Sequence, residues 1–310
     1  MRWDFHDFTV QGDSNSVELM TAWQRSFASR PPSSAEPDIT IRFELIDTLP
    51  PTPQQPPDFQ QGDLLHYYVD GSSVIAHFPR FGQLHLDLAN GTTQGQLLPA
   101  VLHTYGVLED VVAISLSPHL RRRGYFLLHA FAAVYAGKGV LLVGGIGAGK
   151  TTTGMSLLNA GWQLLSNDSP IIAADGQILS YPGVLAGYPD TFARFERTVH
   201  LATQTPTQAG RKKLLVDAES VFSNVWRDRA PIGAICFPQI EAREAHAMEP
   251  LSLPEALRLL LPHAVEQWDR PMIPRHLSIL RQLVSAAPAY RLKLAPDVLT
   301  IPDMIASVLG

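Results

Sequence analysis

The sequence predicts an α/β protein with two domains, an α/β domain in residues 121–310 and an N-terminal α+β domain, mainly antiparallel, in residues 1–120. Short segments of alternating apolar and polar residues fill the first 90 or so positions, which is typical of half-buried strands. Two apolar runs near residue 135 are joined by only a short turn. They must therefore pair antiparallel, because a parallel pair needs a crossover of about a dozen residues. A length of 310 residues suits two domains of about 150 residues each.

Composition excludes several classes of protein. With 45% hydrophobic and 17% charged residues, the chain has the make-up of a folded protein and not of a disordered one. The net charge of −5 argues against nucleic-acid binding, which needs a basic surface. Cys236 is the only cysteine, which excludes an internal disulfide and a cysteine zinc cluster and favours a buried thiol in a reducing compartment. No apolar run reaches the roughly 20 residues of a membrane span, and the N-terminus has no signal-type apolar segment. We therefore expect a cytoplasmic protein with no membrane or nucleic-acid partner.

In the N-terminal domain, strand patterns alternate with turn residues. Strands are predicted at 39–46, 64–69, 73–78 and 83–88. Residues 14–27 form the one helical pattern among them, and the proline-rich segment 50–57 is expected to be an extended loop. From residue 96 to 123 the pattern becomes helical. It ends in Arg121, Arg122 and Arg123, which suits the C-terminus of a helix.

In the C-terminal domain, strands and helices follow in an order that surrounds one glycine-rich segment. Strands are predicted at 126–135, 140–143, 163–166, 171–174, 178–179 and 232–237, and helices at 150–160, 256–261, 275–286 and 302–309. Gly161 is placed to end the first of these helices. Ser252 and Glu255 have the spacing of a capping box at the start of the second.

The glycine-rich segment matches the pattern G-x-x-x-x-G-K-[ST] at every fixed position. It reads Gly144, Gly145, Ile146, Gly147, Ala148, Gly149, Lys150, Thr151. It follows a buried-type strand and opens a helix, as a phosphate-binding loop does. Lys150 would then contact the β- and γ-phosphates, Thr151 would bind Mg²⁺, and Thr152 would lie in the first turn beside the nucleotide. The sequence therefore predicts ATP or GTP binding, with ATP and Mg²⁺ as the expected cofactors.

Segments 123–130, 139–143 and 161–168, taken together with this loop, resemble the catalytic domain of the HPr kinase/phosphorylase family. The similarity is greatest to its shorter relatives, the HPr-kinase-like serine kinases, some of which accompany lasso-peptide biosynthesis, and it covers roughly residues 120–300. The resemblance implies a fold related to phosphoenolpyruvate carboxykinase, with the loop in a mixed sheet. It implies transfer of the γ-phosphoryl group of ATP to a serine hydroxyl of a peptide or protein. It also leaves a homo-oligomer open, because the related bifunctional enzymes are oligomers.

The resemblance also assigns roles to residues near the loop. His129 stands where a histidine orients an acidic pair, and Asp168 stands where the second aspartate of that pair helps to hold the metal. Asn167 stands where the first aspartate acts as general base, and an amide cannot take up a proton at neutral pH. Either Asp168 or another carboxylate such as Asp190 replaces that base, or the protein binds nucleotide without efficient transfer.

Two further features bear on the substrate. The Arg-Gly-x-Gly signature of the phosphorylase reaction is absent after Asp168, which argues against HPr itself as the acceptor. A basic segment with Arg211, Lys212 and Lys213 is either a loop that brings cations to the transferred group or a solvated surface. Arg194 and Arg197 are weaker candidates for the same role. The N-terminal domain is the expected place for substrate recognition, by position alone. The alternatives are a catalytically impaired nucleotide-binding regulator and a small-molecule kinase acting on a metabolite such as free serine.

Overall fold

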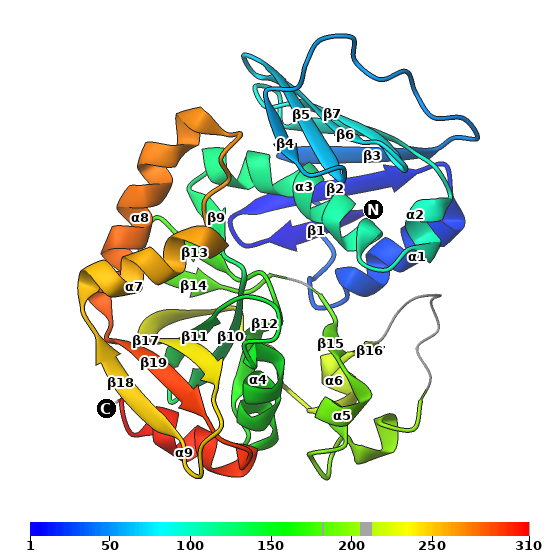
Figure 1. The fold of residues 1–310 in the computed structure, drawn as a ribbon. Coiled ribbons are helices and arrows are strands. Elements are labelled where there is room, and N and C mark those ends of the chain that lie inside the picture. The colour runs from blue at the N-terminus through cyan, green and yellow to red at the C-terminus, as the bar shows by residue number, and fades with distance from the viewer. Residues whose placement is uncertain (182, 205–212, 310) are drawn as a thin grey trace. The chain divides into compact units, whose positions relative to one another are not determined.

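The structure is a computed structural model that describes residues 1–181, 183–204 and 213–309 (Figure 1). The chain divides into two compact units. The first contains Met1–Arg123 together with Glu266–Arg270, a short segment from late in the sequence. The second contains the remaining described residues.

The first unit is built on a mixed sheet with the strand order β1-β2-β3-β8-β7-β6-β5-β4. The strands are β1 (Arg2–Phe5), β2 (Phe8–Ser14), β3 (Ile39–Leu45), β4 (Phe59–Gln61), β5 (Leu65–Asp70), β6 (Ser73–Phe78), β7 (Gly82–Asp87) and β8 (Thr92–Leu97). In this sheet β3 pairs parallel with β2 and with β8, and the other pairs are antiparallel. The four predicted strands are confirmed. Strand β8 was missed because its sequence, Thr-Thr-Gln-Gly-Gln-Leu, has almost no apolar alternation.

Helices cover the apolar face of this sheet. They are α1 (Val17–Ser26), α2 (Ala100–His103) and α3 (Val107–Arg122). The predicted helix begins later than residue 14, because Ser14 still belongs to β2 and Ser16 caps the helix by accepting from the Leu19 amide. Trp23 of α1 packs against Phe43 of β3 with ring centroids 4.9 Å apart. A side chain at Gly12 would lie 2.8 Å from the Trp23 ring, so glycine lets the helix approach the sheet.

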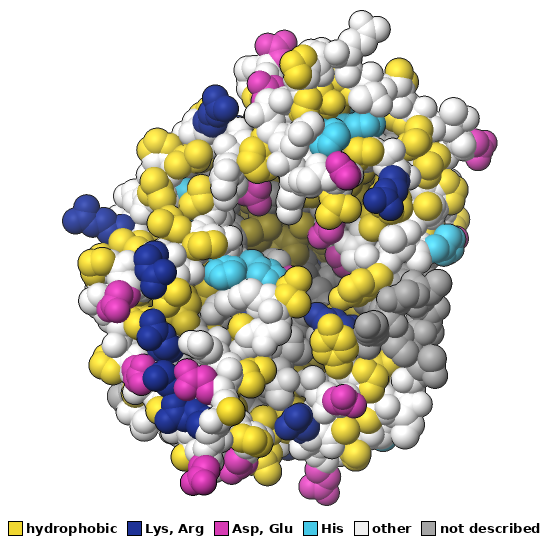
Figure 2. Space-filling view, in the orientation of Figure 1, with side chains coloured by type: hydrophobic (Ala, Val, Ile, Leu, Met, Phe, Trp, Pro, Cys, Tyr) yellow, Lys and Arg dark blue, Asp and Glu magenta, His cyan; other side chains and the backbone are white. Residues whose placement is uncertain are grey.

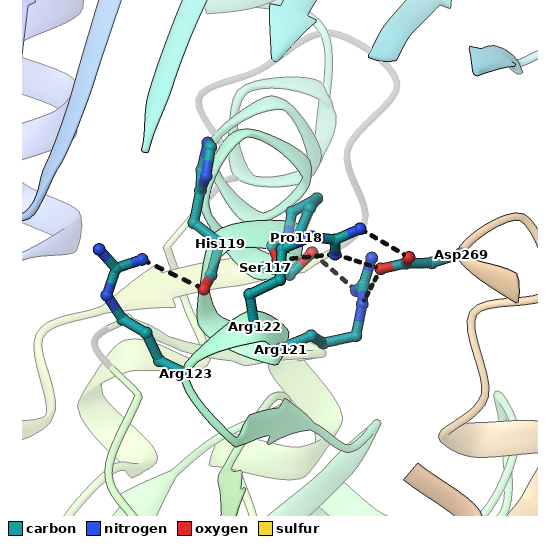
Figure 3. Close-up of polar contacts among 7 residues, drawn as sticks. All are labelled: Ser117, Pro118, His119, Arg121, Arg122, Arg123 and Asp269. Atoms are coloured by element: carbon teal, nitrogen blue, oxygen red, sulfur yellow. Dashed lines mark hydrogen bonds and ion pairs between the residues drawn. The ribbon is translucent and has the colours of Figure 1, made fainter. Parts of the chain in front are cut away.

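The basic end of α3 is held by a buried carboxylate (Figure 3). Arg121 donates its Nε to Oδ2 of Asp269 over 2.7 Å, and Arg122 donates to both oxygens of the same carboxylate over 2.8 and 2.9 Å. Trp268 stacks on Tyr67 of β5 with ring centroids 4.5 Å apart. These contacts explain why Glu266–Arg270 belongs to the first unit.

The second unit contains a second mixed sheet, with the order β12-β10-β11-β17-β14-β13-β9 and with β19 pairing both β17 and β18. Its strands are β9 (Tyr125–Leu127), β10 (Ala130–Tyr135), β11 (Lys138–Val143), β12 (Gln163–Ser166), β13 (Ile171–Ala173), β14 (Gln177–Leu179), β17 (Arg229–Ile240), β18 (Ala247–Leu251) and β19 (Ala289–Leu294). Strand β11 pairs antiparallel with β10 and parallel with β17. This agrees with the predicted α/β class and mixed sheet.

One predicted strand is wrong in a way that concerns the site. The apolar run 126–135 is not continuous: β9 pairs with β13, and β10 pairs with β11 and β12. His129 lies in the break between them, where its amide donates to the carbonyl of His263 over 2.8 Å. An apolar run shows no such break, because both strands consist of apolar and aromatic residues.

Helices cover both faces of this sheet. They are α4 (Lys150–Asn159), α7 (Leu253–Leu260), α8 (Ile273–Ala286) and α9 (Ile301–Ala306). Because side chains of a strand alternate between faces, Phe131 of β10 packs in a core with residues of α4 and α9, and Ala132 packs in another with residues of α7 and α8. The predicted capping box of α7 is confirmed, and Gly161, with φ +87°, follows α4 as predicted.

Strands β1, β2 and β4 of the first unit were not predicted, and neither were several elements of the second unit. Those of the second unit are β15 (Leu185–Gly187), α5 (Pro189–Phe192), β16 (Leu214–Val216), α6 (Ala218–Val221) and the strands β18 and β19. Figure 2 shows basic and acidic side chains alternating over β18 and β19. Glu249 pairs there with Lys293 over 2.5 Å and with Arg291 over 4.0 Å, and such charges discourage pairing of an edge strand with another chain.

In the part of the chain that the structure describes, no helix combines the length and the apolar character that a membrane crossing requires.

Candidate functional site

The register of three strands brings separate chain segments to one edge of the second sheet. Ala130, the first residue of β10, lies opposite Val143, the last residue of β11. Strand β12 also runs antiparallel to β10, and beyond its end the carbonyl of Asp168 accepts from the Ala130 amide over 2.9 Å. His129, the glycine-rich loop (residues 144–149) and the residues after β12 therefore meet at this edge.

The backbone of the glycine-rich loop favours binding of an anion. Gly147 and Gly149 have φ angles of +81° and +97°, which residues with a side chain rarely adopt. Among the loop amides in the described chain, only that of Ala148 donates to another backbone carbonyl, that of Gly145 over 3.3 Å. Gly149 precedes α4 without a side-chain cap, so the first amides of this helix are also open to an acceptor.

Lys150 lies against the loop with 9% of its surface exposed. Its Nζ donates to the carbonyls of Gly144 over 2.5 Å and Gly145 over 3.2 Å, and it lies 3.2 Å from Nε2 of His129. Burial lowers the pKa of Lys150, Asp168 opposes this effect, and the charge of Lys213 adds to it. A phosphate in the loop would supply the negative charge that this ammonium group now takes from carbonyl dipoles.

The two neighbours of His129 determine its tautomer. An ammonium group has no acceptor, so Nε2 must accept from Lys150 and the ring proton of neutral His129 must be on Nδ1. Nδ1 lies 3.3 Å from Oδ1 of Asp168 and can donate to it. Both ring nitrogens are therefore engaged, and His129 links the lysine to the carboxylate.

The structure places Asn167 beside this group but not in it. Its side-chain oxygen is buried and has no hydrogen-bond partner in the described residues. The carboxylate of Asp168, by contrast, is 57% exposed next to His129. Asp190 is exposed on α5, and within the described residues no contact joins it to His129 or Asp168.

Two residues were predicted to hold Mg²⁺. Thr151 is half-buried in the first turn of α4, and Asp168 is exposed. Among the described residues no group of three or more His, Cys, Asp or Glu is arranged to hold a metal ion. Thr151 and Asp168 still fit Mg²⁺, because proteins usually bind this ion with one or two carboxylates while substrate phosphates and water complete its coordination.

Further polar groups lie beside α4. The hydroxyl of Thr152 is 3.3 Å from that of Thr191, which is buried in α5. Lys213 lies over the ring of Tyr188, with its Nζ 5.4 Å from the ring centroid. Arg194 is exposed after α5, whereas Arg211 and Lys212 lie outside the described residues.

The sequence did not indicate His263, which follows α7 and lies beside His129. The two ring centroids are 6.1 Å apart. Burial, together with the nearby His129 and Lys150, lowers the pKa of His263. No local pattern marks this residue, because its contact with His129 depends on how a distant segment returns to the sheet.

The chain was compared with protein families, curated proteins and solved structures. No protein-family model and no curated protein matches the sequence. Among solved structures, the HPr(Ser) kinase/phosphatase from Coxiella burnetii is similar over 59% of this chain and 87% of its own, with 14% sequence identity and a TM-score of 0.29.

Proposed function

We propose that this chain is an Mg²⁺- and ATP-dependent kinase, related to the HPr-kinase-like serine kinases, that transfers the γ-phosphoryl group to a serine hydroxyl of a peptide or protein. The observation that carries the proposal is the joining of the glycine-rich loop to Asp168 through Lys150 and His129 at one sheet edge. The loop sequence supports nucleotide as the ligand, since its pattern is that of phosphate-binding loops.

Phosphoryl transfer depends mainly on positioning and on stabilising charge. Lys150 and the open amides of the loop and of α4 are suited to neutralise phosphate oxygens. Thr151 and Asp168 would hold Mg²⁺, which supplies charge neutralisation at the phosphates when bound. His129 would fix the positions of the Lys150 and Asp168 side chains relative to each other, because its ring contacts both.

A nucleotide-binding regulator is the second candidate, and Asn167 is the observation that favours it. An amide at the position of a general base would reduce the rate by about 10²–10⁴ if no other group took up the proton. Binding of nucleotide would be unaffected, because the loop and Lys150 do not depend on that side chain.

Incubation with Mg²⁺ and γ-labelled ATP separates the two candidates. Serine-containing peptides, free serine and no acceptor would be compared, and both ADP release and label transfer would be followed. Label on a peptide supports the kinase, and label on free serine alone would replace the peptide by a small molecule. Tight binding with neither transfer nor ADP would contradict the kinase and support the regulator.

A further inference from the structure

The proton of the acceptor hydroxyl has no obvious destination among the residues predicted from the sequence. Asn167 cannot accept it, and both ring nitrogens of His129 are engaged. Asp168 is paired with His129 and is the carboxylate expected at Mg²⁺. A proton acceptor for this site must therefore come from another segment.

His263 meets the geometric requirements. Its carbonyl accepts from the His129 amide over 2.8 Å, which fixes it at the same sheet edge as the loop. In the described part of the chain, the ring nitrogens of His263 make no hydrogen bond. They are not buried either, since the buried polar atoms without a partner do not include them. The ring thus offers an accessible nitrogen next to the His129 and Lys150 pair.

We propose that His263 is the proton acceptor for the hydroxyl group that attacks the γ-phosphoryl group, an inference that rests on the proposed function. The hydroxyl oxygen forms a bond to the γ-phosphorus while its proton moves to a nitrogen of His263. The bond from the γ-phosphorus to the β,γ-bridging oxygen breaks, and its electron pair leaves with ADP. The imidazolium then returns the proton to solvent.

The charges around His263 suit this role. The groups that act on it are His129 and Lys150, and both favour the neutral ring that an acceptor requires. In a His263→Gln variant the side chain keeps its polarity but cannot take up a proton near neutral pH. His200→Gln is a matched control, because His200 is an exposed histidine of the same unit, on the 3₁₀ turn Val199–Leu201.

The test compares wild type, His263→Gln and His200→Gln with Mg-ATP and the acceptor that wild type labels. We expect His263→Gln to bind nucleotide within about threefold of wild type and to transfer about 10²–10⁴ times more slowly. In wild type, protonation of the His263 ring lowers kcat/KM toward acid pH. His263→Gln should lose this decline. His200→Gln should match wild type in all three measurements.

Transfer by His263→Gln within threefold of wild type would overturn the role of His263. So would a slower rate that keeps the acid decline. The proposed function fails differently, since wild type itself would then bind no nucleotide or transfer no label.

A second measurement does not depend on the folding of His263→Gln. Diethyl pyrocarbonate modifies neutral, accessible imidazoles, and peptide mass spectrometry identifies the modified histidines. We expect His263 to react in wild type and transfer to be lost in proportion, with nucleotide affinity retained. In Lys150→Met the onset of this reaction should move to higher pH, because removing the ammonium group raises the pKa of His263. Full transfer by a chain modified at His263, or an inert His263, would contradict the proposal.

Discussion

The ammonium group of Lys150 lies 3.2 Å from Nε2 of His129, and the opposite nitrogen of that ring lies 3.3 Å from the carboxylate of Asp168. The three side chains come from the start of α4, from the break before β10 and from the turn after β12. The lysine that would bind phosphate is therefore coupled to the carboxylate that would bind metal.

The carboxylate of Asp269 is expected to be essential for the stability of the first unit. Asp269→Asn leaves Arg121, which is 3% exposed, without its charged partner. Removing one member of a buried ion pair costs about 3–5 kcal/mol. Urea unfolding followed by tryptophan fluorescence measures this loss, since Trp268 adjoins the pair. Asp13→Asn, in an exposed pair of the same unit, is the control and should cost less than about 0.5 kcal/mol. Equal losses of stability in Asp269→Asn and Asp13→Asn would contradict a stabilising role of the buried ion pair.

The Asp269 carboxylate should also make the free energy of unfolding depend on pH. Burial acts to raise the pKa of Asp269, but Arg122 and Arg121 outweigh it, so the pKa lies below its ordinary value. A carboxyl group with a depressed pKa in the folded state contributes stability above its unfolded pKa of about 3.9, and this is lost as pH falls through the folded pKa. The difference in unfolding free energy between wild type and Asp269→Asn should therefore narrow below about pH 4. A difference that stays constant from pH 7 to pH 3 would contradict the ion pair.

Gly149 is expected to tolerate no side chain. Its φ is +97°, and a Cβ there would lie 2.7 Å from Cδ1 of Leu294. Gly149→Ala should weaken nucleotide binding by about tenfold or more, because the loop must shift to relieve strain worth about 1–2 kcal/mol and the clash. Gly161→Ala is a matched control, with φ +87° but open space around the added carbon. It should lower stability by the strain alone and leave the affinity unchanged. Equal affinities of the two variants would show that the loop backbone does not bind the ligand.

Asn167→Asp tests whether the proton acceptor is His263 or belongs at position 167. The amide oxygen of Asn167 is buried without a partner, so a carboxylate there would be desolvated. With His263 as acceptor, we expect the transfer rate to stay within about threefold and the stability to fall by about 1–3 kcal/mol. A tenfold increase in rate would mean that a carboxylate at position 167, and not His263, is the better proton acceptor. Single-turnover transfer and thermal unfolding supply the two values.

Local patterns predicted the parts of the site that are contiguous in sequence. The apolar run of β11, the glycines after it and the helix from Lys150 each follow from residue type and spacing. The proximity of His129 and Asp168 was not derivable from spacing and was expected only from the resemblance. The strand break at His129 was not predicted, because two apolar strands in succession have the pattern of one strand.

Contacts between distant segments could not be predicted. Arg121 and Asp269 are 148 residues apart, and the arginines near residue 121 looked like an ordinary helix end. His263 lies in a leucine-rich segment with no spacing to another histidine that would indicate a site. Its meeting with His129 depends on the path of the chain after α7, which no local periodicity encodes.

Calorimetric titration of Mg-ATP into wild type, Lys150→Ala and Lys138→Ala tests the central claim most directly. Lys138 is a matched lysine at the opposite end of β11, where it donates to the carbonyl of Leu309 over 2.5 Å. We predict that wild type and Lys138→Ala bind alike and that Lys150→Ala binds about 100-fold more weakly, as expected for the loss of charge-assisted hydrogen bonds worth about 1.5–3 kcal/mol. Equal binding by Lys150→Ala, or no binding by wild type, would contradict nucleotide binding at this loop.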